Sequence, residues 1–328
     1  MRKILSALTV GAVLLISAAA SETAEKQYIP LLVDTAGTRT FDLYWMKLNS
    51  NGSIAKGPVL VRDSASGILS AAIVPQGNKI LYAEGSGIAN QIYSVGVNPQ
   101  NGTVVNGPTQ LTTGSTGYFY YGLSIAKDGR KLAYGRNKGE STDFDVFLKR
   151  FKPNGSLKPS TVTIAATGAQ ELGSMITEDG LGVYYSSDFS GPEAILFQKL
   201  KSWGKPSGTP ITVVTYPMVF VKSPRVDAKR EWMSYILGND IWVTRLAATG
   251  AATGTPVKGT SSALGYSVVG GLTRDARLLV YTVVWGGAGL STFTLYSQRL
   301  DASGNPTGAP VVLIPTSTTS VFPWMVDD

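Results

Sequence analysis

The chain has 328 residues, of which 43% are hydrophobic, so it is long enough to bury a large core in one or two domains. It contains no cysteine and no histidine, which excludes disulfides, thiolate chemistry, the Ser-His-Asp arrangement and most transition-metal sites. The formal charge is +7, but the Lys and Arg residues are scattered along the sequence, so we expect no nucleic-acid partner.

The first twenty residues have the pattern of a secretory signal peptide. Arg2 and Lys3 precede an apolar run from Ile4 to about Ile16, and Ala18 and Ala20 satisfy the small-x-small rule for cleavage. An uncleaved membrane anchor is the rival interpretation, but the run is short for a span and no second apolar span follows. We therefore expect cleavage after Ala20, a mature chain of formal charge +5 in the periplasm or outside the cell, and no membrane span after cleavage.

A short motif recurs six times at intervals of about fifty residues. It reads "LDASGNPTGAP" from Leu300, and related forms begin at Leu48, Val97, Phe151, Leu200 and Leu246. Each copy follows a strand-like run with a large residue that we expect in the core: Tyr44, Tyr93, Phe147, Leu196, Trp242 and Tyr296. The 37 glycines and 17 prolines suit short strands joined by tight turns. Such a period indicates a repeat architecture.

Each unit contains four expected strands. An apolar strand leads to an Asp-Gly-type turn and a second strand; a loop leads to the third strand, and the motif is the hairpin to the fourth. Within the motif we expect Leu300 to end the third strand, Gly304 to make the turn and Pro310 to start the fourth strand, at an edge that tolerates proline. The turn positions are Gln76, Asp128, Asp179, Asp227, Asp275 and Asp327, which are 52, 51, 48, 48 and 52 residues apart.

The two ends of the repeat array complement each other. "VFPWMVDD" at the C-terminus matches only the first strand of a unit, whereas "YIPLLVDT" near residue 28 matches the second. We expect these strands to join one sheet, which closes a ring and removes free sheet edges. The predicted fold is an all-β six-bladed β-propeller of four-stranded antiparallel blades over residues 28–328, preceded by a short segment at 21–27.

The signal peptide, the Asp-Gly-type turns and the aromatic third strands resemble the TolB-like six-bladed propellers, which are built from a WD-like repeat. The family turn "SPDG" survives as "VPQG", "AKDG", "TEDG", "RVDA", "TRDA" and "MVDD". TolB carries an additional N-terminal α/β domain, for which we expect no room here, since the first blade begins within about eight residues of the predicted cleavage site. The resemblance implies an envelope or extracellular protein.

Catalysis without histidine would have to depend on carboxylates, as in propeller glycosidases. The candidates in the expected loops are Glu84, Glu140, Asp143, Glu171 and Asp188. No spacing pairs any two of them, so the alternative is that they are solvated loop charges. We expect no catalytic residues, and the enzyme question stays open.

Six-bladed lactonase-like propellers hold calcium in the central channel with inward carboxylates and amides. Here the expected first strands bring mostly small or apolar residues near the axis: Ala72, Ser124, Ser223, Gly271 and Pro323. Lys222 adds a positive charge, which disfavours a hard cation. We therefore expect no metal and no cofactor.

Aromatic side chains gather in the expected loops and strand ends of one face. They are Tyr118, Tyr120, Tyr216, Phe220, Tyr266 and Trp285, with Lys222 beside them. Exposed aromatic rings on a rigid frame are typical of peptide or sugar recognition, although large side chains also fill the gaps between blades. The first hypothesis is a monomeric, non-catalytic scaffold that binds a protein or peptide; the alternative is a propeller that binds or cleaves a carbohydrate.

Overall fold

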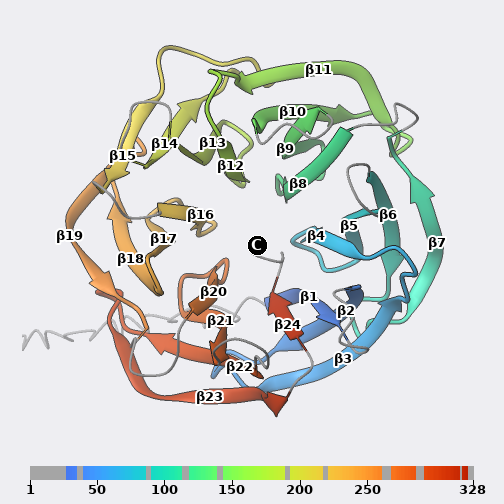
Figure 1. The fold of residues 1–328 in the computed structure, drawn as a ribbon, viewed down its shortest axis with the longest axis vertical. Helices are drawn as coiled ribbons and strands as arrows, with labels where there is room; N and C mark the ends of the chain where they lie inside the picture. Colours follow the sequence, from blue (N-terminus) through green and yellow to red (C-terminus); the bar gives the residue numbers. More distant parts are fainter. Residues whose placement is uncertain are drawn as a thin grey trace, which may run out of the picture.

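The computed structural model describes residues 27–34, 40–85, 90–112, 118–138, 143–188, 193–216, 221–260, 267–285, 292–317 and 320–323. Within these ranges all regular secondary structure is strand, arranged as six four-stranded antiparallel sheets around one axis (Figure 1). The predicted six-bladed β-propeller is confirmed. In the same ranges, no helix has both the length and the apolar character needed to cross a membrane.

Each blade contributes one strand to each of four positions, counted outward from the axis. The first strands are β4 (Ile68–Ile73), β8 (Tyr118–Ile125), β12 (Glu171–Ile176), β16 (Val221–Val226), β20 (Ser267–Leu272) and β24 (Ser320–Pro323). The second strands are β5 (Lys79–Glu84), β9 (Lys131–Lys138), β13 (Gly182–Ser187), β17 (Trp232–Leu237), β21 (Leu278–Trp285) and β1 (Gln27–Asp34).

The outer two positions are filled in the same order. The third strands are β6 (Gln91–Val97), β10 (Asp145–Phe151), β14 (Ala194–Lys199), β18 (Asp240–Leu246), β22 (Thr292–Leu300) and β2 (Asp42–Leu48). The fourth strands are β7 (Val104–Gln110), β11 (Leu157–Ala165), β15 (Ile211–Thr215), β19 (Ala252–Lys258), β23 (Pro306–Ser317) and β3 (Ile54–Arg62). We call the sheet that contains β1–β3 and β24 blade 1, and number the others 2 to 6 along the chain.

The ring is closed by the two ends of the array, as the sequence predicts. Strand β24 pairs antiparallel with β1, with Leu31 opposite Pro323 and Asp34 opposite Ser320. Blade 1 therefore combines three strands from the start of the chain with one from its end. Because β24 occupies the first position beside the axis, this sheet has the same four strands as the other five, and β1 pairs on both sides.

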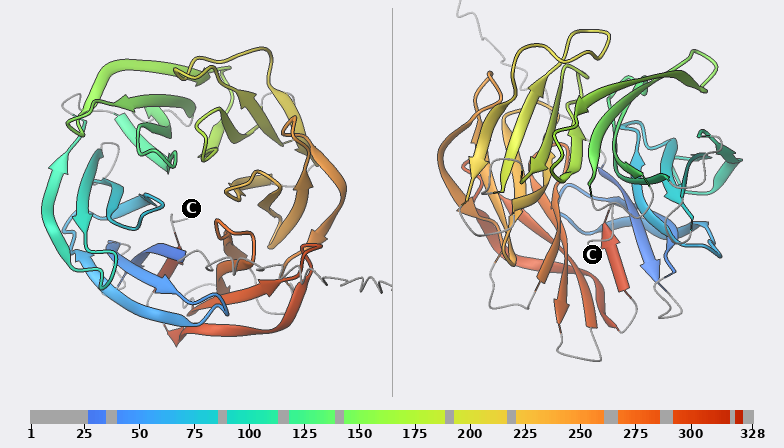
Figure 2. Two further views of the ribbon diagram at one scale, coloured as in Figure 1. Left: turned by 180° about the vertical axis from the view of Figure 1, so that it is seen from behind. Right: turned by 45° about the horizontal axis from the view of Figure 1, so that its top comes forward.

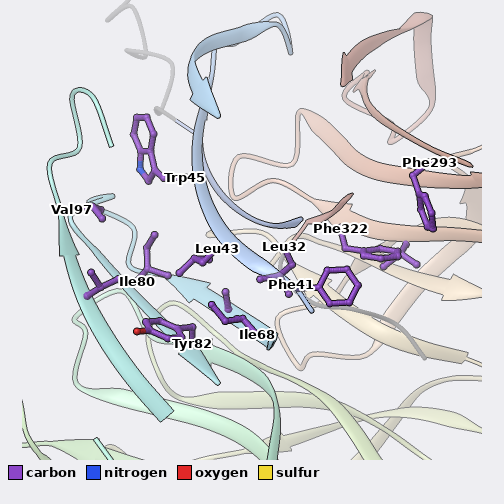
Figure 3. Packing of buried hydrophobic residues seen from close by; sticks show 13 residues of the cluster. Leu32, Phe41, Leu43, Trp45, Ile68, Ile80, Tyr82, Val97, Phe293 and Phe322 are labelled. Atoms are coloured by element: carbon purple, nitrogen blue, oxygen red, sulfur yellow. The ribbon is translucent and has the colours of Figure 1, made fainter. Parts of the chain in front are cut away.

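The core lies between the faces of neighbouring blades. In the cluster at blade 1, Trp45 from β2 and Tyr82 from β5 are completely buried, and Phe293 of β22 joins from blade 6 (Figure 3). Of the six large third-strand residues that we expected in the core, only Phe147 is fully buried; the others are half-buried. Their neighbours on the same strands are buried, as Leu43 and Trp45 beside Tyr44 are, so the expected residues lie on the less covered face of each third strand.

The repeated motif is the hairpin between the third and fourth strands. Its glycine has a left-handed conformation in all six blades: Gly52 (φ 87°), Gly102 (77°), Gly155 (82°), Gly204 (96°), Gly250 (94°) and Gly304 (80°). Gly102 also lies against the neighbouring blade, since a Cβ there would come within 2.4 Å of the Trp45 ring. The motif thus combines a backbone requirement with a close contact between blades. One detail of the prediction is wrong: β23 begins at Pro306, so Pro310 lies inside this edge strand.

The predicted turns between first and second strands are present, with one change of register. Asp128 and Asp179 each accept a hydrogen bond from the amide two residues further on, as expected of Asx turns. In blade 5 the backbone hydrogen bonds make Asp227 equivalent to Thr273 of blade 6, so the true equivalent of Asp275 is Lys229. Asp227 instead binds the amides of the turn with its carboxylate. Asp327 lies outside the described residues.

Candidate functional site

The propeller has two faces that differ in the kind of connection they carry. We call the loop face the side on which second strands lead to third strands and one blade leads to the next. The turn face carries the turns between first and second strands and the outer hairpins of the motif. The strands run between these two faces (Figure 2). The candidate aromatic residues and carboxylates belong to the loop face.

Two of the candidate aromatics, Tyr118 and Tyr120, lie at the start of β8. The Tyr118 ring is half-buried, and the guanidinium of Arg136 lies 4.6 Å from its centroid and 4.1 Å from that of Phe147. Tyr120 is only 7% exposed and its ring packs 5.6 Å from that of Tyr134. Tyr118 therefore offers a ring edge held in place by Arg136, whereas Tyr120 belongs mainly to the core.

The other described candidates lie at the ends of separate strands. Tyr216, just after β15, is half-buried, and its hydroxyl is 3.2 Å from that of Tyr235. Trp285 ends β21 and packs, half-buried, against the hydrophobic cluster of blades 5 and 6. Lys222 is half-buried on β16. No ring contact among the described residues joins the candidates of different blades, and Phe220 and Tyr266 lie outside the described residues.

Two of the candidate carboxylates hold the structure together. Glu84 ends β5 and is 6% exposed; Arg62 binds it at 3.0 Å and the Ser64 hydroxyl donates to it at 2.6 Å, which links blades 1 and 2. Asp188 accepts a hydrogen bond of 2.9 Å from the amide of Gln170. Asp143 is exposed, and Glu140 lies outside the described residues. Glu84 is thus a strand-end residue rather than the loop residue that the sequence predicted.

Glu171 is the most perturbed of these carboxylates. It is the first residue of β12, it is completely buried, and its Oε1 accepts a hydrogen bond from the Thr167 hydroxyl. Its Oε2 accepts none from any described residue. Burial raises the pKa of Glu171, and the nearby charges of Asp145 and Asp143 raise it further. The charges of Asp143 and Asp145 in blade 3 therefore influence Glu171 in blade 4.

Sequence reasoning missed a set of polar residues that anchor the connections between blades. Glu193, just before β14, accepts a hydrogen bond of 2.6 Å from the Val221 amide at the start of β16. Asn90, just before β6, exchanges two hydrogen bonds with the backbone of Tyr120. Their shared signal is a polar residue immediately before a third strand. Burial raises the pKa of Glu193, whereas the Val221 amide and the Lys222 charge oppose that rise.

The central channel contains a small cavity of about 80 Å³ near the turn face. Ala72 and Ser124 line it as expected, but its charge comes from Arg225 and from the contacting pair Arg274 and Glu178. Arg225 lies 4.0 Å from the sulfur of Met175 and passes over Gly271, where a Cβ would approach it to 2.5 Å. Burial lowers the pKa of Arg225 to about 10, so the group remains charged at neutral pH. Among the described residues, no group of three or more acidic side chains could hold a metal ion.

Comparison with known proteins identifies the fold and no sequence family. No protein-family profile matches the chain, and no curated protein sequence matches it significantly. TolB from Acinetobacter baumannii is similar in structure, with a TM-score of 0.59 and 15% identity over 90% of this chain and 66% of TolB. This chain thus spans slightly less than two thirds of that protein. The TolB-like six-bladed propeller predicted from the sequence is confirmed as a fold.

Two further solved structures are similar at the same level. A chain of the nidogen/laminin complex gives a TM-score of 0.58 at 12% identity, over 90% of this chain and 96% of that one. The periplasmic gluconolactonase of Pseudomonas aeruginosa gives 0.53 at 16% identity, over 85% and 81%. The same architecture therefore serves proteins of different names and tasks, and function has to be argued from this chain's own residues.

Proposed function

We propose that the protein is exported and that its loop face binds a protein or peptide, without catalysis and without a cofactor. The observation that carries this proposal is the state of the candidate carboxylates. Glu84 is neutralised by Arg62, and Glu171 is completely buried. Neither presents a carboxylate to a substrate, whereas Tyr118 and Trp285 keep part of their rings exposed at the ends of rigid strands. Such rings bury large area with little loss of conformational entropy.

The structural neighbours support the proposal in two respects. One is a TolB and another comes from a complex named for two proteins, nidogen and laminin. A third is named as periplasmic. Together with the predicted signal peptide, these likenesses support a binding propeller of the cell envelope. Residues 28–328 would then act as one monomeric propeller after removal of residues 1–20.

An affinity capture from envelope extract tests the proposal. The bait is residues 21–328, and the test variant carries Tyr118→Ala with Trp285→Ala. Val105→Ala with Val312→Ala is the control, because both are exposed apolar side chains of outer strands, 57% and 52% exposed, away from the loop-face aromatics. We expect a stoichiometric protein that both the unchanged bait and the control retain and that the double variant loses. Equal capture by all three baits would overturn the role of the loop face, provided that circular dichroism shows all of them folded.

The second candidate function is binding or cleavage of a carbohydrate on the same face. It is favoured by the position of Glu171 near Asp145 and Asp143, because glycoside hydrolysis uses a pair of carboxyl groups and burial raises the pKa of Glu171. The complete burial of Glu171 weighs against it. A glycan array on the same preparation separates the two: a glycan signal without a protein partner, lost in Asp143→Asn, would favour this candidate.

A further inference from the structure

A strongly basic groove lies on the turn face between blades 3 and 4, on the opposite side of the ring from the proposed partner site. It encloses about 410 Å³, within the usual range for a ligand site. Its charged lining comes from the β8–β9 turn, from β10 and its hairpin, and from β11, and comprises Asp128, Arg130, Lys131, Arg150, Lys152 and Lys158. Five cations and one carboxylate give it a formal charge of +4.

The positive charges that line this groove are not balanced by ion pairs with described carboxylates of the protein. None of the ion pairs among the described residues includes any of the five cations. Lys131 is buried and donates to the Gly180 carbonyl at 2.7 Å, whereas Arg130 and Lys152 are exposed. Like charges that line one groove repel one another, and a bound anion would relieve that repulsion.

The fold does not require this charge. A comparable groove on the turn face, formed by blades 5 and 6 and the outer hairpin of blade 1, is lined by four cations and four carboxylates and is formally neutral. Both grooves lie beside the turn between first and second strands and the outer hairpin. The excess of cations is therefore a property of the positions between blades 3 and 4, and it accounts for most of the +5 charge expected for the mature chain.

An exposed tryptophan stands at the edge of the basic groove. Trp203 lies in the outer hairpin of blade 4, is 46% exposed, and lines the groove together with Ser202. The ammonium of Lys205 lies 4.7 Å from its ring, which holds the indole in place on a short hairpin. A flat ring in this position can stack on the apolar face of a sugar.

A second groove continues from the first, between blades 2 and 3. It encloses about 1090 Å³ and shares Arg130 and Lys152 with the basic groove. The rest of its lining is rich in amide and hydroxyl side chains, among them Asn78, Asn106 and Asn154. Amides both donate and accept hydrogen bonds, as sugar hydroxyls require.

We propose that the turn face binds an anionic polysaccharide across these two grooves. The acidic groups of the sugar chain would lie on Arg130, Lys152 and Lys158, one ring would stack on Trp203, and neighbouring hydroxyls would bind the amides between blades 2 and 3. An acidic peptide would use the cations but would have less use for an amide-lined extension. A nucleic acid would require charge along the whole path, whereas the second groove is mostly uncharged.

The test is calorimetric titration of residues 21–328 with polygalacturonate at low and moderate salt. We expect binding that weakens as salt is added, because salt screens the attraction between the exposed cations of the groove and the carboxylates of the polysaccharide. Arg130→Gln with Lys152→Gln and Lys158→Gln should weaken it by about tenfold or more, and Trp203→Ala by about fivefold. The matched control is Arg245→Gln with Arg277→Gln and Arg299→Gln in the neutral groove, which removes the same number of positive charges and should change affinity by less than about twofold.

Three results would overturn the proposal. The first is no binding of polygalacturonate at low salt. The second is equal loss in the triple variant and in the control, which would indicate a response to overall charge alone. The third is equally tight binding of polyglutamate or single-stranded DNA with no effect of Trp203→Ala, which would show that the groove recognises charge without sugar. Neutral dextran should not bind in any case.

Discussion

The six hairpin glycines permit a direct separation of backbone strain from packing. Gly102 and Gly155 both have left-handed backbones, with φ of 77° and 82°. A Cβ at Gly102 would come within 2.4 Å of the Trp45 ring, whereas at Gly155 the nearest atom is the flexible Lys79 Nζ at 3.8 Å. Alanine at either position lowers the free energy of unfolding by about 1–2 kcal/mol because of its left-handed backbone. Its less flexible unfolded chain offsets about 0.4–1 kcal/mol of that loss. Only Gly102→Ala adds overpacking, typically about 1–3 kcal/mol.

We therefore expect Gly155→Ala to lower the free energy of unfolding by about 1 kcal/mol or less, and Gly102→Ala by about 2–4 kcal/mol. Urea unfolding followed by tryptophan fluorescence measures both, with the slope checked for a single transition. Equal losses in the two variants would refute the view that the motif glycine packs against the next blade. A loss below about 1 kcal/mol in Gly102→Ala would show that blade 1 moves to accommodate the methyl group.

Three further predictions concern stability. Ala276→Gly should raise the free energy of unfolding by up to about 1 kcal/mol because Ala276 has φ 56°, whereas Ala302→Gly in a nearby hairpin should lower it; unfolding of both variants in urea checks this. Ser234→Ala should lower the melting temperature, with a loss of about 1–3 kcal/mol, because it leaves the buried Leu272 amide without the acceptor that joins blades 5 and 6. Burial raises the pKa of Glu171 in the folded protein, so ionisation of its carboxyl group destabilises the fold at pH values above that raised pKa. The destabilisation is absent at pH values below the ordinary pKa of a glutamate, where the group is protonated in both the folded and the unfolded chain. Glu171→Gln should therefore raise the melting temperature at pH 7 and leave it nearly unchanged near pH 4, which thermal melts at both pH values check.

The fold could be predicted from the sequence because each repeat position carries its own local requirement. A left-handed glycine in every outer hairpin and an apolar run before it recur in six copies, so errors in one copy are corrected by the others. The prediction failed where two residue types can meet the same requirement. Asp227 caps its turn from the position that Thr273 occupies in blade 6, so the sequence pattern of acidic residues put the turn position of blade 5 at Asp227, two residues before its true equivalent, Lys229. Half-burial of Tyr44 likewise depends on which face of β2 is better covered, and the sequence of β2 is apolar on both faces.

The candidate site was less predictable because its residues come from different blades. The sequence identified Tyr118 and Trp285 as aromatic, but not that Arg136 would hold one ring while the other packs against a core cluster. Glu193 gives no signal until the start of the next blade is known to lie beside it. Arg225 is an ordinary strand residue in the sequence, and only the closure of the ring places it in the channel.

In this protein, selection for function would act at positions that the architecture leaves free to vary. Hairpin glycines, turn residues and apolar strand positions are fixed by the architecture, so similarity at these positions says little about a ligand. The informative positions are those that occupy equivalent places in different blades yet differ in chemistry. The grooves beside blade 3 and beside blade 6 both combine a turn between first and second strands with an outer hairpin, but one is formally +4 and the other neutral. The architecture does not require the excess of cations in the groove beside blade 3, so that excess points to an anionic ligand and not to a role in stability.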